Sequence, residues 1–253
     1  MLLSSVGMAQ TPPYTDNFDS YTLNGYIAAQ NGDWWTTWSN LPGSNEAGQV
    51  SNAYSNSPTQ AILLDEVNAA SDLILKLGDQ VSGSYELKWM MYVENGKCGY
   101  FNIQKTMVPG TQWAYEAYLR TNGDGDLYAG SQTAIPFSYP KATWFEVKNL
   151  IDLDADNIKL FVNGVLIHEW PFSYQASTPS GLKQLGAVNF YAGAVQNSGE
   201  LPVYYIDDVS YTPQMTVLLE DNMEAYALNG YLAVQNPTWY TTWSNAPGTG
   251  EDA

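Results

Sequence analysis

The chain has 253 residues, of which 45% are hydrophobic and 14% aromatic, so it carries enough apolar surface for a packed core and is not globally disordered. Its formal net charge is −17, and all nine of its Lys and Arg residues fall between Lys76 and Lys183. Such a surface repels phosphate backbones and anionic lipids, which argues against a nucleic-acid partner. No apolar run reaches the roughly 18 residues that a membrane span needs.

Residues 1–9, Met-Leu-Leu-Ser-Ser-Val-Gly-Met-Ala, resemble the tail of a secretory signal. They form a short apolar stretch that ends in a small-x-small pattern, consistent with cleavage before Gln10. No basic segment precedes the stretch, so a plain apolar N-terminus is the alternative. We expect an exported protein, extracellular or at the cell surface.

A repeat is the strongest internal signal in the sequence. Its segments recur without gaps at a constant offset of 205 residues: 16–26 as 221–231, 34–40 as 239–245, and 42–43 as 247–248. The period is too long for a solenoid and corresponds to a whole domain, so the pattern predicts a tandem array. We therefore expect one complete domain over 10–213, and the start of a second copy of it over 214–253.

Short strands separated by turns fill the first copy. Residues 84–93 and 144–151 alternate apolar and charged side chains with a period of two, which indicates strands with one face on a core and one in solvent. The segments 122–126 and Asn163-Gly164 supply residues that tolerate positive φ in tight hairpins. No stretch shows helical periodicity with caps. The sequence predicts an all-β fold, a two-sheet antiparallel jelly-roll β-sandwich.

Three segments carry a resemblance to a known family. They are 144–164, with an acidic turn followed by a strand that runs into Asn-Gly; the closing Tyr204-Tyr205-Ile206-Asp207-Asp208-Val209; and the opening Asp16-Asn17-Phe18-Asp19. Together they resemble the concanavalin A-like lectin/glucanase superfamily, especially laminin-G-like jelly rolls, over about residues 14–212. The resemblance implies a tandem module of a secreted bacterial protein. The superfamily holds sugar binders, adhesion modules and glycosidases, so the fold does not choose among them.

A glycosidase needs two carboxylates facing each other across a cleft. Glucanases similar in fold carry a Glu-x-Asp-x-x-Glu run on one strand, and no such run occurs here. Glu86 is followed by Lys88 where the central Asp is expected, and the acidic residues 152–156 lie in an expected hairpin turn. We therefore expect no catalytic activity.

The resemblance also implies a structural calcium ion that ties the first strand to the last. The matching residues are Asp16, Asp19 and one of Asp207 and Asp208, because neighbouring side chains of a strand point to opposite faces. The alternative is that the inward Asp only accepts hydrogen bonds. Asp152, Asp154 and Asp156 have the spacing of a calcium loop, but lack its Gly and its closing Glu.

Exposed aromatic side chains are common platforms for sugar rings, and two sets of them occur. The first, Trp34, Trp35, Trp38 and Asn40, lies beside the Pro42-Gly43 turn, and at least one of Trp34 and Trp35 must face inward if the segment is extended. The second alternates like strand residues, so half of it is core: Trp113, Tyr115, Tyr118, Asn189 and Tyr191. We expect Trp38 to form the contact surface, with Trp34 or Trp35 beside it and Asn40 as a hydrogen-bonding partner.

Neither Cys98 nor His168 has a partner pattern around it. A single cysteine excludes an intrachain disulfide, and a lone histidine indicates no ligand set. The sequence thus predicts a non-catalytic carbohydrate-binding or adhesion module of an exported multidomain protein. Its expected partners are a glycan or surface polysaccharide and neighbouring copies of the same domain. The alternative is a structural spacer with no ligand of its own, and a glycoside hydrolase of the same fold ranks below both.

Overall fold

The computed structural model of the chain describes residues 10–67, 70–195, 198–214 and 223–252. It divides into two compact units, Met1–Met215 and Thr216–Ala253. Among the described residues, no helix has the length and apolar character needed to cross a membrane.

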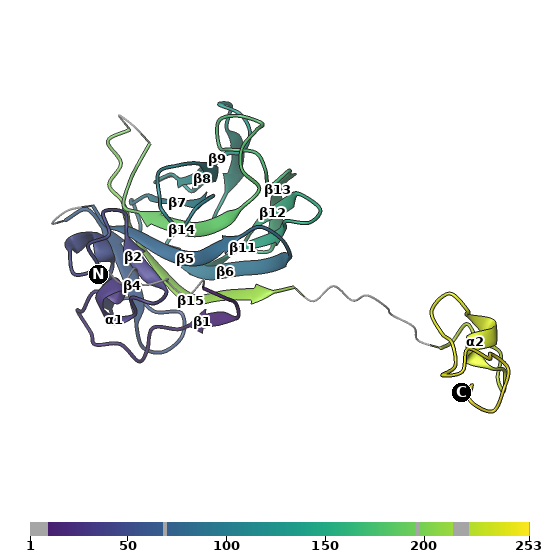
Figure 1. The fold of residues 1–253 in the computed structure, drawn as a ribbon. Coiled ribbons are helices and arrows are strands. Elements are labelled where there is room, and N and C mark those ends of the chain that lie inside the picture. The colour runs from purple at the N-terminus through teal and green to yellow at the C-terminus, as the bar shows by residue number, and fades with distance from the viewer. Residues whose placement is uncertain (1–9, 68–69, 196–197, 215–222, 253) are drawn as a thin grey trace, which may run out of the picture. The chain divides into compact units, whose positions relative to one another are not determined.

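The first unit is a sandwich of two antiparallel sheets, as the alternating pattern predicted (Figure 1). The first sheet has eight strands. Seven run in the order β13-β12-β11-β6-β15-β4-β3, with β1 beside β15. Their bounds are Val165–Trp170 (β13), Asn157–Val162 (β12), Phe145–Asp152 (β11), Ser84–Val93 (β6), Val203–Pro213 (β15), Ala61–Asp65 (β4), Gln49–Ser51 (β3) and Tyr14–Asp16 (β1).

The second sheet has seven strands in the order β10-β9-β8-β7-β14-β5-β2. Their bounds are Ile135–Ser138 (β10), Asp124–Tyr128 (β9), Trp113–Leu119 (β8), Gly99–Gln104 (β7), Leu185–Tyr191 (β14), Asp72–Gln80 (β5) and Trp35–Thr37 (β2). The strand β2 closes one edge of this sheet beside β5, and it brings the segment around Trp38 onto the sheet.

The core fills the space between the sheets. On β6, Tyr85, Leu87, Trp89 and Met91 are buried, as their alternation with Glu86 and Lys88 predicted. Trp89 meets Phe101 and Phe190 edge to face, with ring centroids 5.1 Å apart in both pairs. These aromatic contacts join β6 of one sheet to β7 and β14 of the other.

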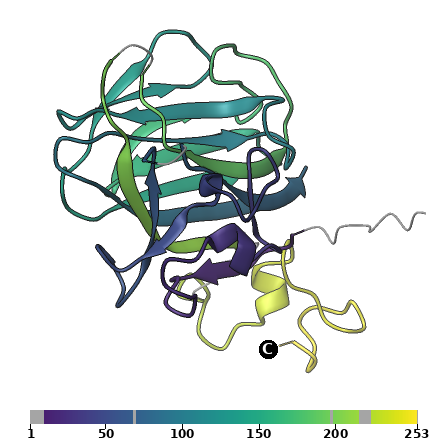
Figure 2. The same ribbon diagram turned by 90° about the vertical axis from the view of Figure 1, so that its left-hand side faces the viewer.

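The hairpins also lie where the sequence placed them. Asn163 and Gly164, at φ 48° and 77°, join β12 to β13 in the mirror-image turn that two-residue hairpins favour. In the described residues, helix is confined to single turns: α1 (Ile27–Gln30), the 3₁₀ turn η1 (Asn45–Ala47), and α2 (Leu232–Gln235) in the second unit. The segment from β1 to β3, purple to blue, gathers on one side of the sandwich (Figure 2).

Candidate functional site

The outer face of the seven-stranded sheet carries polar and aromatic side chains. On β5, three alternate leucines belong to the core, Leu73, Leu75 and Leu77. Side chains of a strand alternate between faces, so Asp72, Ile74 and Lys76 lie on the other face. The register places Asn189 of β14 opposite both Ile74 and Asn102, and Asn102 opposite Glu116 of β8, in one row across the face.

This face is hollowed by about 310 Å³, close to the lower end of the range that small-molecule pockets occupy, roughly 300–1,000 Å³. We call it the tyrosine hollow. Aromatic rings form much of its wall, and amides and carboxylates supply polar groups. Its lining includes Trp38, Tyr100, Trp113, Tyr118 and Tyr191, together with Asp72, Asn102, Glu116 and Asn189. None of its lining residues is Lys, Arg or His.

A chain of hydrogen bonds fixes the polar groups of the tyrosine hollow. Asn189 donates from Nδ2 to Oδ1 of Asp72 at 2.6 Å, and Asn102 donates from Nδ2 to Oδ1 of Asn189 at 2.9 Å. Asn102 Nδ2 also lies 2.9 Å from the hydroxyl of Tyr100, which donates to Oε1 of Glu116 at 2.7 Å. Tyr100, Asn102 and Asn189 are buried, so this network holds a rigid floor under the hollow.

Burial raises the pKa of Asp72 to about 7, against an ordinary value of 3.8. The hydrogen bond from Asn189 opposes the shift, and the negative charge of Glu46 adds to it. A carboxyl group with a displaced pKa in a hollow is a physical mark of a functional site. Near neutral pH, Asp72 can both donate and accept hydrogen bonds.

Trp38 forms one side of the tyrosine hollow and is 36% exposed. Its backbone N–H donates to the carbonyl of Asp72 at 2.9 Å, which holds the residue against β5. Its ring lies nearly parallel to that of Trp113, at 20° and 6.4 Å between centroids. Gly110 (φ +87°) passes so close that a Cβ there would lie 3.1 Å from the indole. The ring is therefore positioned by its surroundings and still presents a surface to solvent.

Neither Trp34 nor Trp35 lines the tyrosine hollow with Trp38, which corrects the expectation that one of them adds its ring to the contact surface there. Trp35 is fully buried and donates from Nε1 to the hydroxyl of Tyr14 at 2.8 Å. Trp34 is half-buried and stacks on the ring of Tyr14 at 4.2 Å. Trp35 faces inward on β2, and Trp34 packs against the core at Tyr14, so both stabilise the sandwich.

Asn40 lies in a second hollow, of about 490 Å³, which we call the edge hollow because it borders β2. Its side chain accepts a hydrogen bond from Thr36 Oγ1 at 3.0 Å, and the residue adopts φ 54° in a tight turn. Trp38 lines this hollow as well as the tyrosine hollow.

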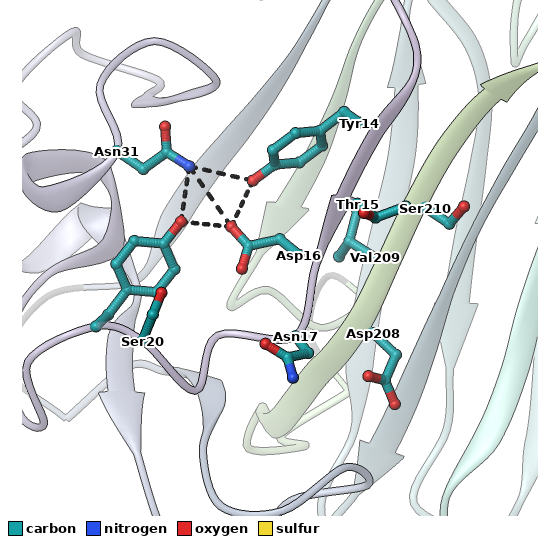
Figure 3. A pocket seen from close by; sticks show the side chains of 10 residues that line it. Tyr14, Thr15, Asp16, Asn17, Ser20, Asn31, Asp208, Val209 and Ser210 are labelled. Atoms are coloured by element: carbon teal, nitrogen blue, oxygen red, sulfur yellow. Dashed lines mark hydrogen bonds between the residues drawn. The ribbon is translucent and has the colours of Figure 1, made fainter.

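The four aspartates of the expected calcium site are spread over the β1–β15 side of the sandwich. Asp16 and Asp208 line one open hollow of about 550 Å³ (Figure 3). There Asp16 Oδ2 accepts hydrogen bonds from the hydroxyls of Tyr14 and Tyr21 at 2.6 and 2.5 Å. Asn31 donates to the same oxygen at 3.5 Å. The Asp16 carboxylate thus ties β1 to the loop that follows it.

Asp19, Asp207 and Asp208 have partners of their own. Asp19 accepts from the backbone of Thr59 and Gln60, and Asp208 from the Asn56 side chain. Asp207 is fully buried and accepts from three backbone N–H groups, while burial raises its pKa to about 6. Within the described part of the chain, no three His, Cys, Asp or Glu residues gather as a metal site. The calcium ion therefore stays a prediction.

Sequence reasoning identified part of the tyrosine hollow and missed the rest. Trp113, Tyr118, Asn189 and Tyr191 of the second aromatic set line it, and Tyr115 alone belongs to the core between the sheets, fewer than the half that was expected. A register shift between β7 and β8 separates Trp113 from Tyr115, which alternation alone would place on one face. Asp72, Tyr100, Asn102 and Glu116 were not identified. The alternation within each strand places them on the outer face, but only the pairing of β5, β14, β7 and β8 brings them together.

The environments of Cys98 and His168 give neither residue a functional role. Burial raises the pKa of the Cys98 thiol to about 12, which makes it a poor nucleophile. His168, on β13, stacks on Trp170 with centroids 5.3 Å apart.

No protein-family model and no curated protein matches the chain. Solved structures do share its fold. A sialidase aligns over 80% of this chain and 18% of its own length, at 13% identity and a TM-score of 0.54. An alginate lyase, solved as a double mutant in complex with an alginate trisaccharide, aligns over 80% of this chain and 98% of its own, also at 13% identity and 0.54. Such identities show the sandwich fold alone.

Proposed function

We propose that the chain is a non-catalytic carbohydrate-binding module whose ligand lies in the tyrosine hollow against Trp38. The observation that carries the proposal is the combination in one hollow of partly exposed aromatic rings with a buried, hydrogen-bonded polar floor. Sugar rings present C–H faces to aromatics and hydroxyls to amides and carboxylates, so they match both features.

The spacing of the two carboxylates supports a binding role over hydrolysis. Asp72 lies on β5 and Glu116 on β8, with β14 and β7 between them. Three strand spacings separate their backbones by about 14 Å. In glycosidases the two carboxyl groups, about 5–9.5 Å apart, face each other across the scissile bond with space for substrate or water between them. Asn189, Asn102 and Tyr100 fill the interval and bond to one another and to the two acids.

The charge of the hollow favours a neutral glycan. Asp72 and Glu116 are its acidic lining groups, and no lining residue is basic. A uronic or sialic acid would bring a further carboxylate next to them without a cation to offset it, which is costly in a partly desolvated site. We therefore expect the ligand to carry hydroxyl groups and no carboxylate at this position.

The test is a glycan array probed with the full chain. We expect signals on neutral glycans and none on glycans built from uronic or sialic acids. An array bound only at acidic glycans would contradict the charge argument. An array with no bound glycan would contradict the proposed function, and the spacer hypothesis would then replace it.

A further inference from the structure

The tyrosine hollow and the edge hollow meet at Trp38, which lines both. Along the outer face of β5, Asp72 lines the first hollow, Lys76 lines the second, and Ile74 lies between them. Ile74 is fully buried although it lies outside the core between the sheets. β5 therefore extends from one hollow to the other, and the buried side chain of Ile74 lies on the stretch between them.

The loop from Lys105 to Gln112 borders the edge hollow and supports the tryptophan that the two hollows share. Gly110 backs the Trp38 ring, and its N–H donates to Oε1 of Gln104 at 3.1 Å, while Gln104 donates to Oδ1 of Asn102 in the polar network. Val108 of the same loop lines the edge hollow and is 73% exposed. The two hollows thus share one tryptophan, and the loop that lines the edge hollow holds its ring.

The edge hollow offers contacts of the same kinds as the tyrosine hollow. One face of the site is apolar, from Val108 and Pro109, and hydrogen-bonding groups come from Thr36, Asn40 and Lys76. Its volume of about 490 Å³ also falls within the range of ligand pockets, roughly 300–1,000 Å³. A ring seated on one side of Trp38 therefore leaves room for further units on the other side.

We propose that the ligand is a segment of a neutral oligosaccharide or polysaccharide chain that crosses Trp38 and occupies both hollows, rather than a single terminal sugar. This inference rests on the proposed carbohydrate function. It assigns the edge hollow as a second part of the binding site and makes affinity depend on chain length, because linked units bind at a high effective concentration.

The test uses the full chain and oligosaccharides of one to six units from neutral β-1,4-glucan, β-1,3-glucan, β-1,4-mannan and β-1,4-xylan, measured by calorimetric titration. For the glycan that binds, we expect affinity to rise at least tenfold from the single sugar to the longest chain. Equal affinity of the single sugar and the longest chain would overturn this inference and leave the proposed function intact. No binding of any of them, together with an array on which no glycan is bound, would overturn both.

A substitution in the edge hollow separates the contribution of this hollow to glycan affinity from that of the tyrosine hollow. Val108→Trp fills that hollow from an exposed position, so we expect the longest chain to bind at least tenfold more weakly and the shortest bound chain to bind as before. Val165→Trp is the matched control, since Val165 is 63% exposed on β13 and lines neither hollow. A Val108→Trp variant with unchanged affinity for the longest chain would overturn the assignment of the edge hollow.

Discussion

Trp35 and Trp38 lie three positions apart and have different environments. Trp35 faces the core, packs against Phe18 and Phe190, and has no exposed surface. Trp38 follows the end of β2 on the outer face and keeps 36% of its surface exposed. Trp35 faces inward on β2, whereas Trp38 lies just beyond the end of that strand. The sequence predicted that at least one of Trp34 and Trp35 faces inward, without distinguishing between them.

Alanine substitutions at these two tryptophans should have opposite effects. Trp35→Ala removes a fully buried ring and should lower the free energy of unfolding by about 3–5 kcal/mol. Trp38→Ala should leave the melting curve close to that of the wild type and weaken glycan binding by about 2 kcal/mol or more. Denaturant unfolding and titration of both variants check this. A large loss of stability in Trp38→Ala would assign Trp38 to the core and favour the spacer function.

Asp72 should make the protein more stable in mild acid than in mild base. Its ordinary pKa is 3.8 and its folded pKa is about 7, so the folded state binds the extra proton between these values. The stability it contributes is fully present below about pH 4 and is lost as the pH rises through about 7. The difference in pKa sets an upper limit of about 4 kcal/mol.

Asp72→Asn isolates this effect, since an amide can accept the same hydrogen bond and does not titrate. Asp207, with its raised pKa, changes stability in the same direction and is retained in the variant. Urea unfolding at about pH 5 and pH 8 should show a smaller loss of stability with rising pH in Asp72→Asn than in the wild type. An identical loss in both proteins would show that Asp72 does not titrate in this range.

At the scale of elements, the N-terminal segment forms the same local structure in both units. Gln30 accepts a hydrogen bond from the backbone N–H of Thr22 and donates to its carbonyl, and Gln235 does the same with Ala227, 205 residues later. The helical turn α1 also corresponds to α2. Positive φ angles at Phe18, Asn24 and Asn40 recur at the equivalent positions of the second unit, Met223, Asn229 and Asn245. Contacts within about 35 residues therefore specify this conformation without the two sheets.

Strands, hairpins and the fold class followed from alternation and turn residues, because those signals are local. The single-turn helix α1 could not be predicted from the sequence, because four residues are too few to show a helical periodicity. The tyrosine hollow depends on the pairing of Asn102 with Asn189, 87 residues apart, and no pattern within one strand encodes that pairing. The Trp34 stack on Tyr14 depends in the same way on how a loop meets β1.

The predicted calcium ion would link β1 to β15, so its test is thermal. If calcium binds the folded state alone, it raises stability by roughly 2.7 kcal/mol at a hundred times the dissociation constant. The melting temperature should then rise with calcium, fall with chelator, and respond less in Asp208→Asn, which alters one carboxylate of the hollow shared with Asp16. A melting temperature indifferent to calcium and chelator would remove the ion from the account.

At the scale of the whole molecule, the second unit holds the repeat of the segment from Asp16 onward. Several of its large apolar side chains are exposed, Trp243 fully and Leu228 at 91%. In the first unit the corresponding segment packs against β5 and β15 through β2 and β1. Described residues 223–252 contain no strand.

A chain ending at Pro213, the last residue of β15, should therefore fold as stably as the full chain. Limited proteolysis of the full chain should first remove residues after about 214, and both proteins should melt at the same temperature. Aggregation or unfolding of the shortened chain would show that the C-terminal residues complete the sandwich, contrary to the expected domain boundary.

The position of a bound neutral glycan on the protein tests the proposed binding site most directly. The chain has nine tryptophans, and their indole N–H signals can be assigned by single substitutions and followed by NMR as the glycan identified on the array is added. We expect the signals of Trp38 and Trp113 to shift, and those of the buried Trp35 and Trp89 to stay in place. Shifts confined to Trp34, with Trp38 and Trp113 unchanged, would place the ligand elsewhere and contradict binding in the tyrosine hollow.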